Sequence, residues 1–145
     1  MRLSEMIAKK SGIPDGFKGV RAKWDEINAP FQIEKAAILQ RPAVNAAGET
    51  ITFSKGSMAG STVMDRMAVL QIVTSDGQYL IKTNSKRITS LFLSQIDGKE
   101  ADDTNAFGDE IFIVEPPEGW LKFVPFRQKY ADGKEGNVAD LAEAE

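Results

Sequence analysis

Cysteine and histidine are both absent from the 145 residues of this chain. Their absence excludes disulfide bonds, thiol redox chemistry, Ser-His-Asp and Cys-His catalysis, and the usual zinc sites. Long apolar runs are also missing, so no segment has the length that a membrane-spanning helix needs. Residues 1–12 lack the apolar core of a signal peptide. We expect a soluble, intracellular protein with no membrane partner.

The net charge of −3 is small, but charges of opposite sign gather in different segments. The segment 1–96 carries a net charge of +5, and the segment 97–118 carries −7. The following segment, 119–131, carries +3, and the last one, 132–145, carries −4. An acidic protein with this pattern can still present a basic surface. Chance clustering in a short chain explains the pattern equally well.

Hydrophobic residues make up 42% of the chain, which is enough for the core of one domain. We predict that residues 1–29 form a partly ordered N-terminal arm and that residues 30–130 form the domain. Residues 131–145 contain no aromatic residue and few large apolar ones. They are therefore expected to be an acidic, flexible tail.

A β-hairpin is the clearest local signal. Residues 66–74 and 78–83 are rich in strand-forming residues, and the Asp76-Gly77 pair between them favours a tight type I′ turn. A two-residue turn places Ile72 opposite Ile81. The core-facing side of this hairpin is expected to carry Leu70, Ile72, Tyr79 and Ile81, and the other side to be partly polar.

Three further strands and one helix are predicted. The strands cover residues 31–40, 110–115 and 120–126. Arg41-Pro42 is expected to end the first of them. The helix covers residues 86–96, with Ser85 as its N-cap. Its apolar stripe consists of Ile88, Leu91, Phe92 and Ile96.

The segment 43–64 is rich in Ala, Gly, Ser and Thr, and we expect a mobile excursion that contains a small hairpin. The complete order is then five strands with a helix between the third and the fourth. This is the order of the OB-fold. We therefore predict a mainly β protein, a five-stranded OB-fold-like barrel with one short helix between strands 3 and 4. Another small β-barrel or a two-layer α+β sandwich would contain the same elements.

Motifs for phosphate or metal binding are weak. The glycine-rich run Lys55–Ser61 lacks the Gly-Lys-Ser/Thr ending and the strand–helix context of a P-loop. Four acidic residues between 102 and 110 lack the regular spacing of a calcium loop and are expected to form a solvated acidic loop. We expect no cofactor, no metal and no enzymatic activity.

Aromatic and basic residues alternate on the last predicted strand, where Trp120 and Lys122 share a face. Such a surface can bind single-stranded nucleic acid, because bases stack on the rings while cations follow the phosphates. Alternatively, these aromatic side chains belong to the core. The candidate DNA-binding residues are Arg41, Lys55, Arg66, Gln71, Tyr79, Lys82, Lys86, Arg87, Trp120 and Lys122.

One stretch of the sequence resembles a known family. Residues 24–33, Trp-Asp-Glu-Ile-Asn-Ala-Pro-Phe-Gln-Ile, look like the lead-in to the first strand of single-stranded-DNA-binding proteins of tailed phages. The Asp76-Gly77 hairpin, the Thr83-Asn-Ser85 turn and the helix that follows resemble the next part of that pattern. The resemblance covers residues 24–126 and implies an OB-fold that coats single-stranded DNA, without catalysis or metal.

The resemblance also implies a setting and partners. The setting is phage DNA replication or recombination in the cytoplasm of the host cell. Residues 140–145 resemble the acidic tails that recruit replication or recombination proteins, although Glu145 replaces the terminal apolar residue of bacterial tails.

We therefore predict a non-catalytic protein that binds single-stranded DNA with little sequence preference and that could assemble into a homo-oligomer. Two other functions remain open. One is a small phage structural or assembly protein with a β-barrel core. The other is a metal-dependent nuclease that uses the carboxylates of the acidic loop.

Overall fold

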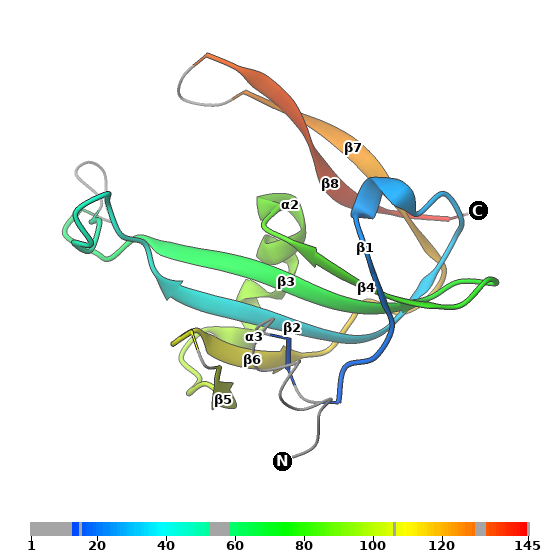
Figure 1. Cartoon of the computed structure of the whole chain (residues 1–145), viewed down its shortest axis with the longest axis horizontal. Helices are drawn as coiled ribbons and strands as arrows, with labels where there is room; N and C mark the ends of the chain where they lie inside the picture. The colour runs from blue at the N-terminus through cyan, green and yellow to red at the C-terminus, as the bar shows by residue number, and fades with distance from the viewer. Residues whose placement is uncertain (1–12, 15, 53–58, 106, 130–132, 145) are drawn as a thin grey trace.

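The computed structural model describes residues 13–14, 16–52, 59–105, 107–129 and 133–144 (Figure 1). Within these residues, eight strands form a six-stranded sheet, in the order β1-β4-β3-β2-β6-β5, and a two-stranded sheet, β7-β8. The strands are β1 (Val20–Ala22), β2 (Gln32–Pro42), β3 (Met64–Val73), β4 (Gln78–Thr83), β5 (Asp103–Thr104), β6 (Glu110–Val114), β7 (Leu121–Lys129) and β8 (Glu135–Glu143). The helical segments among the described residues are η1 (Trp24–Glu26), α2 (Lys86–Thr89), η2 (Ser90–Phe92) and α3 (Leu93–Ile96).

The fold is mainly β, as predicted, but the described strands do not close into a barrel. β1 and β5 lie at the two edges of the large sheet. The predicted fifth strand, β7, pairs along its whole length with β8. Its described backbone pairing with the first predicted strand is one bridge between Leu121 and Phe31, beside which the Phe123 and Phe31 rings pack with their centres 4.6 Å apart. β7 therefore finds its partner in a strand that the sequence did not predict, and the large sheet stays open.

The β3–β4 hairpin has the predicted faces in a different register. Ile72 lies opposite Tyr79, because the loop has four residues and not two. The Thr74 backbone N–H donates to the Gly77 carbonyl at 2.8 Å, and the Asp76 N–H donates to Thr74 Oγ1 at 3.0 Å. A register shift of two residues leaves every side chain on its predicted face, since side chains alternate with a period of two.

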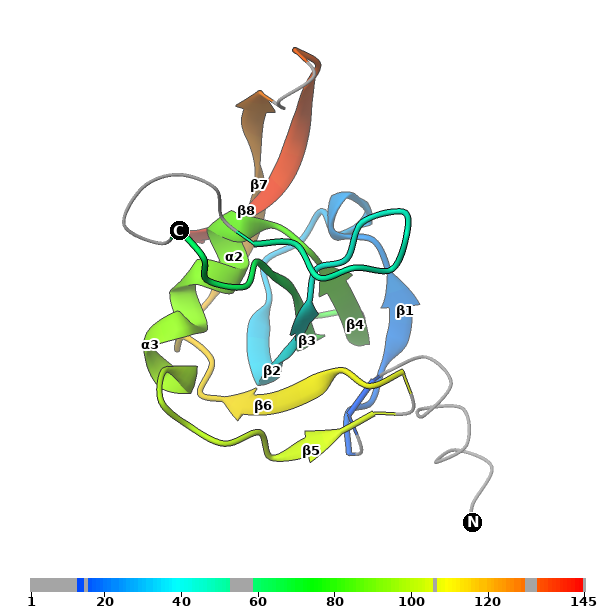
Figure 2. The ribbon, with the colours of Figure 1, turned by 90° about the vertical axis from the view of Figure 1, so that its left-hand side faces the viewer.

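The main core lies between one face of the large sheet, the helical segments and the base of the β7–β8 arm. Figures 1 and 2 both show this arm, the β7–β8 hairpin, projecting from the rest of the molecule. Ile88, Phe92 and Ile96 are buried in this core as predicted. Leu91 is 51% exposed, against prediction, because the 3₁₀ turn η2 interrupts the α-helical period. None of the described helices is long and apolar enough to cross a membrane.

A second, smaller apolar cluster lies on the opposite face of the sheet. Ala37, Leu39, Val69, Leu80 and Ile111 form it together with Ile13, and Phe17 and Met67 pack against it. The chain from residue 13 to residue 18 therefore covers part of this face.

The prediction that residues 131–145 form a flexible tail is wrong for most of this segment. Nine residues, Glu135–Glu143, form β8, which pairs with β7 from Leu121–Glu143 to Lys129–Glu135. Ala139 is buried and Leu141 packs against the core. The segment has little side-chain propensity for a strand, but β7 supplies a complete ladder of backbone partners. Residues 131, 132 and 145 lie outside the described residues.

The fold also begins before the predicted boundary at residue 30. β1 pairs in parallel with β4, Val20 opposite Tyr79. Gly19, at φ +136°, makes this approach possible, because an added Cβ would lie 2.8 Å from the Tyr79 carbonyl carbon. Residues 1–12 of the predicted arm lie outside the described residues.

The segment after β2 contains the expected small hairpin. β2 runs through Pro42, beyond the predicted stop, and antiparallel bridges join Val44 to Thr50 and Thr52 to Thr62. The Ala43 N–H donates to the Val63 carbonyl just before β3, so the nitrogen of Pro42 points to the opposite side of β2. The pairing of β2 with β6 extends only to Gln40, so Pro42 takes the place of no hydrogen-bond donor in that ladder. Residues 53–58 lie outside the described residues.

Candidate functional site

Two of the predicted basic residues meet on the face of the sheet that carries the smaller apolar cluster. Arg41 and Lys82 line a hollow of about 290 Å³, together with Asp65, Asn84 and Asp109. Lys82 also lines a neighbouring hollow of about 420 Å³ with Arg21, Lys23 and Trp24, and the carboxylates of Asp25 and Glu26 share this lining. We call the two hollows together the cationic groove, after its central cations Arg21, Arg41 and Lys82.

The strand directions bring these three cations to the same region. β1, β2 and β4 all run in the same direction, because β1 is parallel to β4 and both β2 and β4 are antiparallel to β3. Arg41 and Lys82 lie near the ends of their strands. Arg21 lies opposite Leu80, two residues before Lys82 and on the same face of the sheet. The cationic groove thus takes one residue from each of three strands.

Lys82 is the electrostatic centre of the groove. Burial lowers its pKa from the ordinary value of 10.5, and the charge of Arg21 lowers it further. Asp109 acts in the opposite direction and raises the pKa, whereas Arg41 lowers it. An ammonium group in this position is therefore held close to two other cations and one carboxylate.

Asp109 reaches the groove from the turn before β6. Its Oδ1 lies 3.5 Å from Arg41 Nε, and its Oδ2 accepts a hydrogen bond from Asn105 Nδ2 at 3.0 Å. Asn105 Oδ1 in turn accepts from the backbone N–H groups of Phe107 and Asp109. The same turn leaves the Phe107 side chain 56% exposed.

The acidic loop makes bonds of its own within the fold. Asp102 Oδ2 accepts a hydrogen bond from the Ile113 backbone N–H at 2.7 Å. Among the described residues, no group of three or more His, Cys, Asp or Glu side chains could hold a metal ion.

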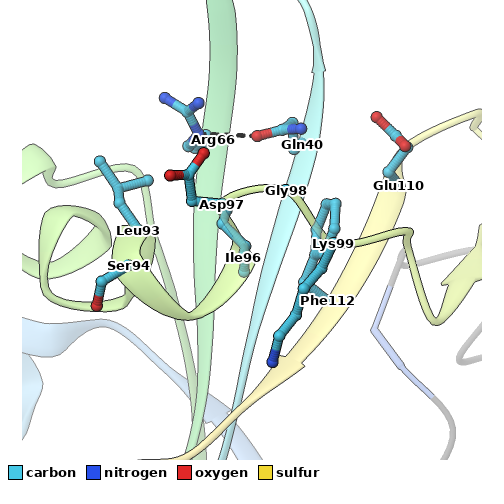
Figure 3. A pocket seen from close by; sticks show the side chains of 10 residues that line it. All are labelled: Gln40, Arg66, Leu93, Ser94, Ile96, Asp97, Gly98, Lys99, Glu110 and Phe112. Atoms are coloured by element: carbon cyan, nitrogen blue, oxygen red, sulfur yellow. Dashed lines mark hydrogen bonds between the residues drawn. The ribbon is translucent and has the colours of Figure 1, made fainter.

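Arg66 takes part in a different environment. It borders the groove, but its Nε donates to Gln40 Oε1 at 2.9 Å, opposite it on β2. Both residues line a hollow of about 520 Å³ between the end of α3 and the strands (Figure 3). The carboxylates of Asp97 and Glu110 share this lining, so Arg66 has anionic neighbours on this side.

Gln71 is not part of an open surface, whereas Tyr79 lines a third hollow, of about 430 Å³, beside Arg21. Gln71 is buried; its Oε1 accepts a hydrogen bond from the Lys18 backbone N–H at 2.7 Å, and its Nε2 donates to Glu34 at 3.3 Å. It therefore holds the N-terminal segment on the sheet. Tyr79 is half-buried and packs against the main core.

The remaining described candidates lie near the β7–β8 arm. Lys86 is exposed at the start of α2. Arg87 Nη2 lies 3.2 Å from Asp140 Oδ2, and its guanidinium lies 4.3 Å from the centre of the Phe126 ring. Asp140, expected in a free acidic tail, is thus bound to the body of the protein.

Trp120 and Lys122 lie at the base of this arm. Trp120 precedes β7 and is 49% exposed, so the alternative that places it in the core is wrong. Its neighbour Leu121 bridges Phe31, ten residues before Arg41. At about 3.3 Å per strand residue, Trp120 is roughly 30 Å from Arg41 along β2. The Trp24 end of the groove is nearer to the arm, since the Trp24 and Phe123 ring centres lie 6.5 Å apart. The predicted site residues therefore form two groups and not one surface.

Lys55 lies outside the described residues. Arg21 is the central cation of the groove that the sequence did not single out. It precedes its strand partner by 59 residues and lies in the segment that was assigned to the N-terminal arm. No protein-family model, curated protein or solved structure matches this chain, so its function has to be inferred from these residues.

Proposed function

We propose that this protein binds single-stranded DNA, without catalysis and with little sequence preference, through the cationic groove. The observation that carries the proposal is the convergence of Arg21, Arg41 and Lys82 from three strands on one hollowed face. Burial is the main cause of the lowered pKa of Lys82, and repulsion by the charges of Arg21 and Arg41 lowers it further. A polyanion relieves this repulsion when it binds, and a phosphate backbone is a polyanion with regularly spaced charges.

The surroundings of the groove favour a single strand over a duplex. Trp24 lines the hollow beside Lys82, and Phe107 is exposed on the turn that carries Asp109. Base stacking on such rings needs unpaired bases and tolerates any sequence. The two hollows have the size of small-ligand pockets, so they fit individual nucleotides.

We also propose that the large sheet is an open form of the OB-fold. β2 pairs with both β3 and β6, β3 pairs with β4, and the helical segment lies between β4 and β6. These pairings are the ones expected for the first four predicted strands. Together with the resemblance of residues 24–126, they support a role in phage DNA replication or recombination.

The test is a titration with oligo-dT and with duplex DNA of equal length, at several salt concentrations. Binding is measured as the quenching of tryptophan fluorescence. Arg41→Ala and Lys82→Ala should weaken the binding of oligo-dT and reduce the slope of log K against log salt by about 0.7 for each lost phosphate contact. Arg127→Ala, which removes an exposed cation of the arm, is the control. Equal losses in all three variants, or no binding by the wild-type protein at low salt, would reject the proposal.

The β7–β8 arm favours one alternative function. The arm projects from the rest of the molecule (Figure 1), and its Phe126 is 39% exposed. A projecting arm with an exposed aromatic side chain is a surface through which an assembly protein contacts a partner. Sedimentation of the protein alone distinguishes this function, because an assembly role predicts a defined oligomer that Phe126→Ser disrupts. A metal-dependent nuclease has less support, since Asp102 and Asp109 are engaged with the backbone, Asn105 and Arg41.

A further inference from the structure

We infer that Asp109 occupies the position in the cationic groove that a phosphate of the bound strand takes, and that the strand must displace it. This inference rests on the proposed function and adds a built-in competitor to it. Asp109 would then set the affinity of the groove for DNA.

The position of the carboxylate supports this assignment. Asp109 lines the same hollow as Arg41 and Lys82, and its Oδ1 lies 3.5 Å from Arg41 Nε. Its side chain is 15% exposed, so the carboxylate is inserted among the groove residues and does not extend into solvent. It is also the acidic neighbour that raises the pKa of Lys82. Of the two carboxylates that line this hollow, Asp65 and Asp109, it is Asp109 that forms the ion pair with Arg41 and so partly neutralises the cations to which a phosphate would bind.

The ion pair is of a kind that a phosphate can replace. The Arg41 side chain is 59% exposed, and a single contact at 3.5 Å is long for a charge-assisted hydrogen bond. Pairs of this kind contribute little net free energy in water. A phosphate offers more acceptor oxygens to the same guanidinium, which can bind them in a bidentate manner.

The turn that carries Asp109 is held mainly by its own bonds. The Asn105 N–H donates to the Asp109 carbonyl at 3.0 Å, and the Gly108 N–H donates to the Asn105 carbonyl at 3.1 Å. Its attachment to β5 is short, since β5 has two residues that pair with β6. The turn can therefore shift as a unit and keep its internal hydrogen bonds while Asp109 leaves Arg41.

The test compares Asp109→Asn with Asp103→Asn. Both variants lose one negative charge from the same loop, but Asp103 is exposed on β5 and does not line the groove. Near physiological salt, where charges are screened beyond about 8 Å, Asp109→Asn should bind oligo-dT at least about threefold more tightly than the wild type. Asp103→Asn should match the wild type. In an Arg41→Ala background the gain from Asp109→Asn should be smaller, because Lys82 is then the cation that remains beside residue 109.

A titration with sodium tripolyphosphate separates this inference from the proposed function. Asp109→Asn should bind this anion more tightly than the wild type, as measured by calorimetry without DNA. If neither protein binds oligo-dT but the variant gains affinity for tripolyphosphate, the DNA proposal fails and the role of Asp109 stands. If the variant gains affinity for neither ligand, or if Asp103→Asn gains as much, the inference is overturned.

Discussion

The hydroxyl group of Ser85 donates a hydrogen bond to the backbone oxygen of Ala139, 54 residues later in the chain. Both residues are buried, at 2% and 1% exposure. Pro125 is the partner of Ala139 on β7. The backbone N–H and C=O of Leu121 are hydrogen-bonded to Phe31, so they point away from β8. In an antiparallel pair this direction alternates, so Leu121, Phe123 and Pro125 are all in pairs that have no backbone hydrogen bonds between β7 and β8. The Ala139 carbonyl therefore points outward, where Ser85 meets it.

Replacement of this hydroxyl should destabilise the fold. Ser85→Ala leaves a buried carbonyl without its donor, and we expect the free energy of unfolding to fall by about 1–3 kcal/mol. Denaturation in urea measures the change. Ser90→Ala is the control, because Ser90 is exposed and bonds within its own turn. Equal effects of the two substitutions would contradict a structural role for the Ser85–Ala139 bond.

Removal of residues 131–145 should also destabilise the protein, contrary to what a flexible tail implies. The deletion removes β8, the packing of Leu141 and the acceptor for Ser85. We expect a loss of about 3 kcal/mol or more, the combined scale of a lost core side chain and a lost buried hydrogen bond. Thermal unfolding of the shortened protein checks this expectation, and an unchanged midpoint would show that β8 adds nothing to the fold.

Lys82→Met should stabilise the protein at neutral pH while it weakens DNA binding. Because the folded state lowers the pKa of Lys82, the charged form costs stability below that pKa. Between the lowered pKa and 10.5, Lys82 binds more protons in the unfolded chain than in the folded protein. The wild-type protein therefore gains stability as the pH rises through this range, and the penalty for the buried charge disappears. The gain in unfolding temperature should therefore shrink between pH 7 and about pH 10.5.

The matched control for this experiment is Lys86→Met, which replaces an exposed lysine on α2. It should show no comparable dependence on pH. If Lys82→Met is less stable than the wild type at pH 7, packing of the lysine stem outweighs the charge and the electrostatic explanation is wrong.

The two tryptophans should report DNA binding differently. Trp24 lines the groove beside Lys82, whereas Trp120 is not among the residues that line either hollow and lies at the base of the β7–β8 arm. Oligo-dT should therefore quench the fluorescence of the Trp120→Phe variant, in which Trp24 remains, and leave that of Trp24→Phe almost unchanged. The reverse result would place the DNA on the β7–β8 arm, as the sequence alone suggested.

Local patterns in the sequence were enough to predict the core of the large sheet. Alternation of apolar residues identified which sides of β3 and β4 face inward, and the stripe of the helix was correct at Ile88, Phe92 and Ile96. The hairpin register was not predictable, because it depends on Thr74 capping its own loop. β8 was missed because backbone pairing with β7, and not its side chains, makes it a strand.

The candidate site was less predictable than the fold. Arg41 and Lys82 were identified as basic residues on or beside strands, but nothing local shows that they share a hollow. Arg21 and Asp109 complete the groove from segments far from both in the chain. Gln71 looked like a surface residue because its buried partner, the Lys18 N–H, lies 53 residues away.

The pairing of distant segments has a consequence for the kinetics of folding. β1 cannot pair until β4 has been synthesised, and Ser85 has no acceptor until Ala139 has been added. Contacts of such large sequence separation slow folding, because a long loop must close before they form. During synthesis, the β2–β3–β4 meander can form first, whereas the Ser85 hydroxyl at the start of α2 makes its native hydrogen bond only after Ala139 has been added. Completion of this fold therefore depends on the synthesis of β8.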